Sequence, residues 1–187
     1  MNGPVLWVED DADDVFLIGH AIRKAGLDQP SLVRDGGEAV DYLSGSGKYA
    51  DRGAYPFPTL ILLDLKIPKM SGFEVLSWIR QRSEVRRVPV VMFTSSREAC
   101  DVDRAYDLGA NAYLLKSVDH DDLVEALRRV RAFWLDLNVH PTSPVAMSRA
   151  SALGVGALAP GESRMLRDSG AGARKSDCDR LAPDGGL

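Results

Sequence analysis

Five short apolar runs, separated by segments with helical spacing, constrain the fold of this chain more than any other feature of its sequence. Their length suits strands, and their continuous apolar character suits strands buried on both faces, as in a parallel sheet. The runs are Pro4–Val8, Ser31–Val33, Thr59–Leu63, Val88–Phe93 and Ala112–Leu115. Because strands and helices alternate, we expect an α/β fold, a doubly wound domain with a five-stranded parallel sheet and right-handed crossovers.

Apolar residues at helical spacing fill the segments between these runs. The first such helix has Val15, Ile18 and Ile22 on one face and stops at Gly26. The others are expected near residues 38–43, 73–80, 97–108 and 123–134. Acidic residues at 119–122 favour the start of the last helix. Residues 44–58 are rich in Gly and Pro, so we expect a long surface loop there.

The composition changes near Pro141. Of the 47 residues from 141 to 187, 25 are Gly, Ala, Ser or Pro, and none is aromatic. Such a segment buries too little apolar area to offset the entropy lost on ordering it. We therefore expect a folded domain over residues 1–140 and a flexible tail over 141–187. The alternative is a short helix at Ser148–Leu158, which Gly154 and Gly156 disfavour.

Charge and cysteine content bear on partners and location. The formal net charge is −4 and the isoelectric point about 5.4, which disfavours broad attraction to nucleic acid or anionic lipid. No apolar stretch approaches the ~20 residues of a membrane span, and no secretory signal is visible at the N-terminus. The two cysteines, Cys100 and Cys178, lie in different sequence contexts and do not suggest a disulfide framework. We expect a cytoplasmic protein without a nucleic-acid or membrane partner.

Polar residues follow four of the predicted strands. They are Glu9 and Asp10 after the first, Asp64 after the third, Thr94 at the end of the fourth and Lys116 after the fifth. Ligands of doubly wound folds bind at this edge of the sheet. Clustered carboxylates need a cation unless they are protonated, and oxygen ligands select Mg²⁺ or a similar ion. With that charge neutralised, Asp64 is able to attack a phosphoryl group, whose oxygens would meet Lys116 and Thr94.

Four stretches of the chain resemble the receiver domain of two-component response regulators and occur in the order of that family. They are Val5–Asp11, Leu60–Gly72, Val90–Ser96 and Gly109–Lys116. The resemblance is closest to stand-alone receivers that partner bacterial phytochromes. It rests there on the helix Asp35–Leu43, the extended segment 44–58 and the sequence Phe133–Leu135. It implies the flavodoxin-like receiver fold.

The resemblance also implies a role for each residue that matches a family motif. Asp64 is the expected phosphoacceptor, with Mg²⁺ as its cofactor. The expected metal ligands are Asp64, Asp10 directly, Glu9 mainly through bound water, and the backbone carbonyl of Lys66. Thr94 and Lys116 are expected to sense and stabilise the phosphoryl group. Tyr113 resembles the switch aromatic, whose ring turns inward as Thr94 moves toward the phosphate.

Each candidate has a simpler interpretation that the sequence leaves open. The acidic run Asp10, Asp11, Asp13 and Asp14 also suits a solvated helix N-terminus, and we leave Asp11 outside the site for that reason. Thr94 is also suited to cap the next helix, Lys116 to lie exposed at a strand end, and Tyr113 to pack in the core. We expect the three histidines to be surface residues, because their spacing does not suit a metal site, and residue 100 to be structural.

Two positions depart from the family pattern. The family has a proline with a cis peptide after the lysine of the fifth strand, and this chain has Ser117. Because a non-proline cis bond costs ~3–4 kcal/mol, we expect a trans bond, a shifted loop and a less firmly placed Lys116. The second departure is Ser71, where the family often has Asp; serine caps a helix equally well.

The expected function is a stand-alone phosphorylation switch without enzymatic activity beyond slow self-dephosphorylation. A sensor histidine kinase, of the phytochrome type by resemblance, would donate the phosphoryl group, and the output would be a protein contact. In the resembling group, strands four and five and the last two helices form a homodimer interface. Phe133, Trp134 and Leu137 suit such a contact, and they equally suit packing on the domain's own sheet.

Two other functions remain as alternatives. A degenerate receiver would bind partners without being phosphorylated, and only Ser117 favours that hypothesis. A metal-dependent phosphatase with Asp64 as nucleophile would need an acidic residue two positions later, where this chain has Lys66.

Overall fold

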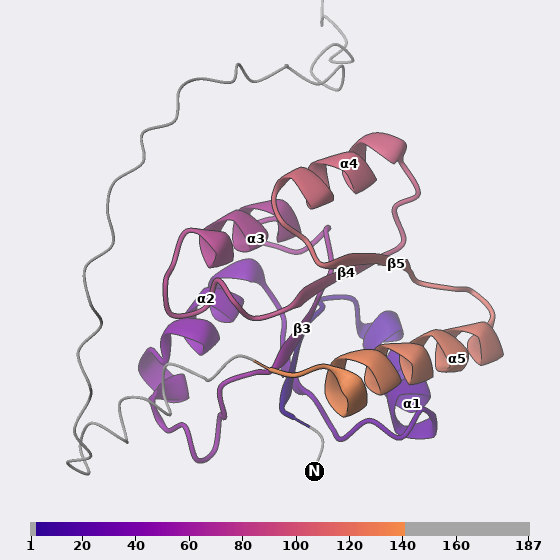
Figure 1. Ribbon diagram of the computed structural model, residues 1–187, viewed down its shortest axis with the longest axis horizontal. Helices are drawn as coiled ribbons and strands as arrows, with labels where there is room; N and C mark the ends of the chain where they lie inside the picture. The colour runs from indigo at the N-terminus through magenta and orange to yellow at the C-terminus, as the bar shows by residue number, and fades with distance from the viewer. Residues whose placement is uncertain (1–2, 141–187) are drawn as a thin grey trace, which may run out of the picture.

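The structure, a computed structural model, describes residues 3–140 of the chain. These residues contain a five-stranded parallel sheet with the strand order β2-β1-β3-β4-β5 (Figure 1). The strands are β1 (Val5–Val8), β2 (Ser31–Val33), β3 (Leu60–Leu63), β4 (Val90–Thr94) and β5 (Ala112–Leu115). The predicted fold class is confirmed. The expected tail over 141–187, with its alternative short helix, lies outside the described residues.

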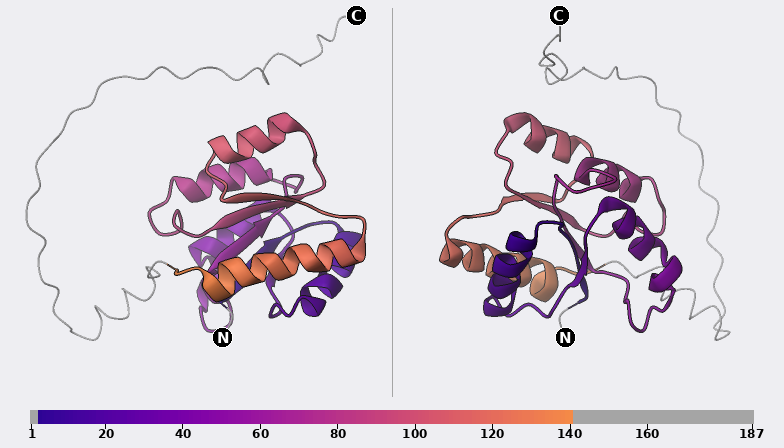
Figure 2. Two further views of the ribbon diagram at one scale, coloured as in Figure 1. Left: turned by 45° about the vertical axis from the view of Figure 1, so that its right-hand side comes forward. Right: turned by 180° about the vertical axis from the view of Figure 1, so that it is seen from behind.

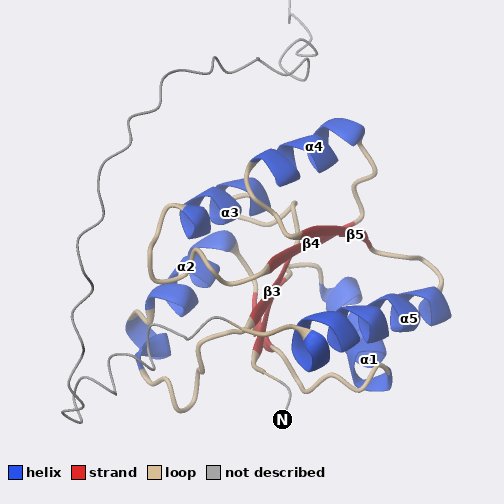
Figure 3. Ribbon diagram, in the orientation of Figure 1, coloured by secondary structure: helices blue, strands red, loops and turns tan. Residues whose placement is uncertain are grey.

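Helices cover both faces of the sheet, as Figures 2 and 3 show. On one face lie α1 (Ala12–Lys24) and α5 (His120–Arg131). On the other lie α2 (Gly36–Ser44), α3 (Gly72–Arg80) and α4 (Ala99–Asp107). Each expected helix is present, with ends that differ from the expected ones by one to three residues at most positions, because capping residues rather than apolar spacing set the first turn.

The sheet separates two apolar cores. The four residues of β1 are all buried, and they alternate between the two faces. Leu6 and Val8 belong to the core under α2, α3 and α4, and Val5 and Trp7 to the core under α1 and α5. Burial on both sides is the reason that the strands read as continuous apolar runs.

The segment 44–58 is more ordered than the expected surface loop. It contains the short 3₁₀ helix η1 (Gly47–Ala50), and the side chain of Tyr49 is buried. Tyr49 contacts the rings of Tyr42 and Tyr55 with centroid distances of 5.0 and 4.9 Å. Arg52 donates hydrogen bonds to the carbonyl oxygens of Tyr42 and Leu43 at 2.7 and 2.9 Å. Contacts of the tyrosine rings and of Arg52 therefore hold this segment against α2. The Gly and Pro content of the segment did not predict this order.

The end of the described chain continues α5 as a wider π-helical turn, η2 (Ala132–Leu137). Trp134 packs against the core under α1 and α5, whereas Phe133 and Leu137 are 54% and 75% exposed. Packing on the domain's own sheet is thus confirmed for Trp134, and a dimer contact by Phe133 and Leu137 stays a prediction. Within residues 3–140, no helix combines the length and the apolar character needed to span a membrane.

Candidate functional site

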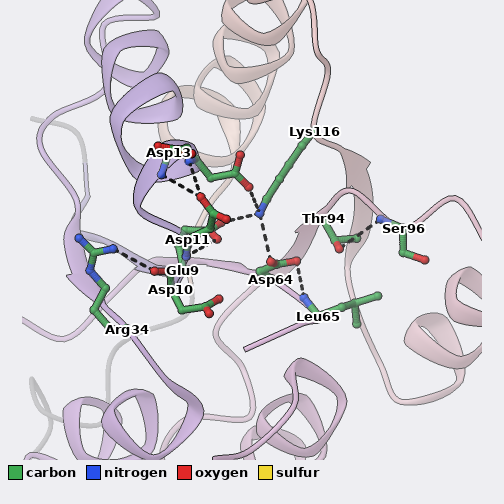
Figure 4. Close-up of polar contacts among 11 residues, drawn as sticks. Glu9, Asp10, Asp11, Asp13, Arg34, Asp64, Leu65, Thr94, Ser96 and Lys116 are labelled. Atoms are coloured by element: carbon green, nitrogen blue, oxygen red, sulfur yellow. Dashed lines mark hydrogen bonds and ion pairs between the residues drawn. The ribbon is translucent and has the colours of Figure 1, made fainter. Parts of the chain in front are cut away.

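Backbone hydrogen bonds of the sheet place the candidate residues together at the carboxyl ends of the strands. The backbone N–H of Glu9 donates to Val33 at 3.0 Å, and that of Asp64 donates to Val8 at 3.1 Å. The N–H of Lys116 donates to the carbonyl of Thr94 at 2.8 Å. The parallel ladder therefore extends one residue beyond the strand ends and brings residues far apart in sequence to the same edge (Figure 4).

Three carboxylates form an acidic cluster at this edge. Glu9, Asp10 and Asp64 each offer one oxygen, and these oxygens lie within 4.8 Å of one another. Glu9 is fully buried, Asp64 is 7% exposed and Asp10 is exposed. Burial raises the pKa of Glu9 to about 7, although the Lys116 ammonium opposes the shift. An oxygen-only donor set of this kind fits a hard divalent cation.

Lys66, whose backbone carbonyl was expected to complete the metal ligands, lies two residues after Asp64. Its side chain is exposed, in agreement with a role that does not depend on it. The ligand role of its carbonyl stays a prediction.

The ammonium of Lys116 lies among carboxylates from three elements. Its Nζ is 2.6 Å from Glu9 Oε2, 3.0 Å from Asp64 Oδ2 and 2.7 Å from Asp14 Oδ2. Burial by itself would lower the pKa of this ammonium, but the three acidic neighbours raise it above its ordinary value. The lysine is therefore charged and only 8% exposed, which excludes the alternative of an exposed strand-end lysine.

Ser117 follows Lys116 at the position where the family has a proline. The peptide bonds of residues 3–140 are all trans, the one between Lys116 and Ser117 included, as predicted. The side chain of Ser117 accepts a hydrogen bond from the N–H of Asp119 at 3.1 Å. Three carboxylates surround Nζ, and the expectation that the lysine is less firmly placed than in the family stays a prediction. A shift of the loop relative to the family stays a prediction.

The loop after β3 fixes the carboxylate of Asp64. The N–H of Leu65 donates to Asp64 Oδ1 at 2.6 Å, which leaves Oδ2 to Lys116. Gly72, the first residue of α3, donates its N–H to the carbonyl of Leu65 at 2.9 Å. A Cβ at position 72 would collide with the carbonyl oxygen of Asp64. The start of α3 therefore lies directly against the backbone of the candidate phosphoacceptor.

Thr94 and Tyr113 come from β4 and β5, which follow β3 in the order of the sheet. Thr94 is fully buried, and its Oγ1 accepts a weak hydrogen bond from the N–H of Ser96 at 3.4 Å. It does not cap α4, whose N-cap is Glu98. The hydroxyl of Tyr113 donates to the carbonyl of Ser96 at 3.1 Å, and its ring packs partly buried against the core. Both residues thus contact the same short loop, and the switch role of Tyr113 stays a prediction.

Two acidic residues of the expected helix start have different roles. Asp11 caps α1 by accepting hydrogen bonds from the N–H groups of Asp13 and Asp14 at 2.8 and 3.0 Å, as its place at a helix N-terminus predicts. Its place outside the site stays a prediction. Asp14, which sequence reasoning left in the same capping run, is instead a partner of Lys116. A signal was present: Asp14 lies one turn before the buried Ile18 and so on the sheet-facing side of the helix.

His20 is exposed, as expected, but it has a partner that the sequence does not indicate. His20 Nδ1 and His120 Nε2 lie 3.3 Å apart, so α1 and α5 bring together two residues that share no sequence motif. Cys100 is exposed near the start of α4, and the expectation of a structural residue is wrong.

Comparison with known proteins agrees with this site. The profile of the response regulator receiver domain matches residues 5–128. Response regulator Rcp1 of Synechocystis sp. is 36% identical over 140 residues, which are 74% of this chain and 93% of Rcp1. The structure of the phosphorylated cyanobacterial phytochrome response regulator RcpA is 36% identical with a TM-score of 0.67, over 76% of this chain and all (100%) of RcpA. The bacteriophytochrome response regulator RtBRR is 42% identical with a TM-score of 0.61, over 82% of this chain and 93% of RtBRR.

One of these proteins, Rcp1, has been solved in a Mn²⁺-bound form, which agrees with a metal site at the acidic cluster. The match has a TM-score of 0.66 and covers 75% of this chain and 99% of Rcp1. The matched segment includes each strand end that contributes to the site. The chain therefore belongs to the response regulator receiver family.

Proposed function

We propose that this chain is a stand-alone phosphorylation switch whose Asp64 accepts a phosphoryl group from a sensor histidine kinase of the phytochrome type. One observation carries the proposal: the carboxylates of Glu9, Asp10 and Asp64 converge within 4.8 Å, with the Lys116 ammonium 3.0 Å from Asp64. RcpA and RtBRR are phytochrome response regulators, which supports a phytochrome-type kinase as donor.

Mg²⁺ is the proposed cofactor. Glu9, Asp10 and Asp64 would hold it together with the backbone carbonyl of Lys66, because the side-chain donors are all carboxylate oxygens. When bound, the cation neutralises negative charge at the acceptor and polarises the oxygens of the phosphoryl group.

The chemical step is an exchange of one bond at phosphorus. A carboxylate oxygen of Asp64 forms a bond to phosphorus while the P–N bond of the donor phosphohistidine breaks. The electron pair of that bond leaves with the imidazole nitrogen, which takes up a proton. The product is an acyl phosphate on Asp64. Lys116 and Thr94 meet its oxygens with an ammonium and a hydroxyl, and Tyr113 follows the movement of Thr94.

Acetyl phosphate with Mg²⁺ and intact-mass measurement test this function. We expect a gain of one phosphoryl group per chain, which is absent in Asp64→Asn and in the presence of EDTA. Slow loss of the adduct after removal of the donor would show the proposed self-dephosphorylation. If the folded protein gains no mass, the chain is a degenerate receiver. Multiple-turnover phosphate release without accumulation of the adduct would instead indicate a phosphatase.

The surface beside Asp64 suggests where the kinase approaches. Phe16 and Leu17, in the early part of α1, are 76% and 54% exposed, and Val118 in the loop after Lys116 is fully exposed. A helix that carries the phosphohistidine needs an apolar surface close to the acceptor. We expect Phe16→Ala to slow transfer from a phosphorylated phytochrome-type kinase while leaving the reaction with acetyl phosphate unchanged. Tyr106→Ala, exposed on α4, is the control, and equal slowing by both variants would contradict this assignment.

The proposed output is a homodimer through β4, β5, α4 and α5. Exposed apolar side chains at the end of the described chain support it, namely Phe133 and Leu137 on η2.

A further inference from the structure

The ammonium of Lys116 has one more acidic partner than the proposed reaction requires. An ammonium offers three N–H groups, and Nζ lies within ion-pair distance of Glu9, Asp64 and Asp14, at 2.6, 3.0 and 2.7 Å. Glu9 and Asp64 belong to the acidic cluster at the strand ends, whereas Asp14 comes from the first turn of α1. We propose that Asp14 is a positioning residue that holds the Lys116 ammonium over Asp64 during phosphoryl transfer, an inference that rests on the proposed function.

Asp14 is the partner whose interaction survives the reaction. Once Asp64 carries the phosphoryl group, the acyl phosphate replaces its charged carboxylate. Glu9 belongs to the acidic cluster that would bind the cation. Asp14 lies outside that cluster and forms no bond to phosphorus, so its ion pair with Lys116 persists from the free to the phosphorylated form. Because the ion pair with Asp14 is present in the free and in the phosphorylated form, it keeps the Lys116 ammonium in position throughout the reaction.

The location of Lys116 explains why such an anchor is needed. It follows β5, which lies at the edge of the sheet, and the residues of β5 are less buried than those of the other long strands. The next residue is Ser117 with a trans peptide, so the backbone there lacks the proline of the family. A lysine side chain has four rotatable bonds, so it adopts a single conformation only when its ammonium group is bound.

Asp14 itself is on a rigid support. Its N–H donates to the capping carboxylate of Asp11 at 3.0 Å, and α1 continues into the buried residues Ile18 and Ile22. Its side chain is 36% exposed and contacts Lys116 from the helix side of the site. The carboxylate therefore supplies a fixed negative charge from a helix packed against the sheet rather than from a loop.

The test compares Asp14→Asn with Asp13→Asn, since Asp13 lies on the same helical turn and is exposed. With acetyl phosphate and Mg²⁺, we expect Asp14→Asn to lower the maximal phosphorylation rate about five- to tenfold, as expected for losing a charge-assisted hydrogen bond. The Mg²⁺ concentration at half-maximal rate should change less than about threefold. Asp13→Asn should match the wild type in both quantities, and thermal unfolding verifies that each variant is folded.

Combining Asp14→Asn with Lys116→Gln distinguishes positioning of the lysine from a general effect of removing a negative charge. Because Asp14 acts through Lys116, we expect Asp14→Asn to cause no further slowing in Lys116→Gln. In the unphosphorylated protein, the ¹⁵N-detected ammonium signal of Lys116 should broaden in Asp14→Asn and persist in Asp13→Asn. Together these results would identify Asp14 as an anchor for the ammonium.

Each other outcome overturns the proposal. An Asp14→Asn rate equal to that of the wild type, or equal slowing in the Lys116→Gln background, excludes positioning through the lysine. An Mg²⁺ requirement raised as much as in Asp10→Asn would make Asp14 a metal ligand instead. A wild-type protein that takes up no phosphoryl group refutes the proposed function itself, and this inference with it.

Discussion

At the scale of single residues, the site depends on a glycine as much as on its charged side chains. The backbone of Gly72 lies so close to Asp64 that any side chain there would meet the carbonyl oxygen of the phosphoacceptor. Gly19, in the interior of α1, offers the opposite case, because the nearest atom to an added Cβ is Arg23 Nη1 at 3.9 Å. Two glycine-to-alanine changes therefore have opposite expected effects.

We expect Gly72→Ala to lower the free energy of unfolding by about 1–3 kcal/mol, since the loop after Asp64 must shift. The rate of phosphorylation by acetyl phosphate should fall as well, because the shift moves the acceptor carboxylate. Urea unfolding and intact-mass kinetics measure the two effects. Gly19→Ala, which improves helix propensity by up to ~1 kcal/mol, should leave stability unchanged or raised. Equal stability of the two variants would contradict the close approach of α3 to Asp64.

At the scale of elements, short polar contacts decide where helices begin. Ser71 and Glu74 form a capping box at the start of α3: Ser71 Oγ accepts from the N–H of Glu74 at 3.4 Å, and Glu74 Oε2 accepts from the N–H of Ser71 at 2.8 Å. The prediction that Ser71 replaces the aspartate of the family as a cap is confirmed. This cap starts the helix that follows the loop of Asp64.

We expect Ser71→Ala to cost about 1 kcal/mol of stability through loss of the cap. Ser71→Asp should cost clearly less, because an aspartate carboxylate accepts the same N–H and favours a helix N-terminus. Denaturant unfolding of both variants measures the difference. Equal losses would show that the cap contributes little to this helix.

A second polar contact between elements is made by Glu38 of α2, which binds residues of η1. Its carboxylate accepts from Lys48 Nζ at 2.7 Å, from the Tyr49 hydroxyl at 2.6 Å and from the N–H of Arg34 at 2.7 Å. Burial raises its pKa, but these donors lower it more, and the net pKa is about 2. A depressed pKa stabilises the fold above the ordinary carboxylate range, and that contribution disappears as the pH falls toward 2.

We therefore expect Glu38→Gln to be less stable than the wild type at pH 7, by about 1–2 kcal/mol. The difference should shrink as the pH falls from about 4.5 toward 2, where the wild-type carboxyl also loses its charge. Urea unfolding at pH 7, 5 and 3 follows this trend. Asp41→Asn, an exposed position of the same helix, is the control. A difference that stays constant with pH would mean that the charge of Glu38 does not stabilise η1.

At the scale of the whole molecule, two exposed apolar side chains at the end of α5 and η2 have no place in either core. They extend the proposed homodimer face formed by β4, β5, α4 and α5. Phosphorylation acts on Asp64 at the edge of the same sheet, and Thr94 and Tyr113 connect that edge to β4 and β5. Assembly is therefore expected to follow phosphorylation.

We expect acetyl phosphate with Mg²⁺ to raise the fraction of dimer in sedimentation velocity. Leu137→Asp should lower that fraction at least fivefold, because it places a charge in the apolar contact. Phe16→Asp, on α1 and so outside the elements of the proposed dimer face, is equally exposed and should dimerise like the wild type. A protein that stays monomeric after stoichiometric phosphorylation, or a Leu137→Asp variant that dimerises normally, would exclude this interface.

The sequence by itself determined the elements and the residues at the strand ends. Apolar runs and helical spacing depend on the local backbone, and caps such as Asp11 and Ser71 act within a single turn. Asp64 and Lys116 were identifiable because each directly follows an apolar strand, and parallel strands end at a common edge.

Only the tertiary structure decided which of these residues meet. The pairing of Lys116 with Asp14 joins positions 102 residues apart, and it depends on how α1 packs on the sheet and against α5. The contact between His20 and His120 depends on the same packing of α1 against α5. The order of segment 44–58 likewise required the tyrosine rings to meet. Such contacts depend on how the elements pack against one another. Apolar periodicity and capping residues report only on the local backbone, so they do not predict this packing.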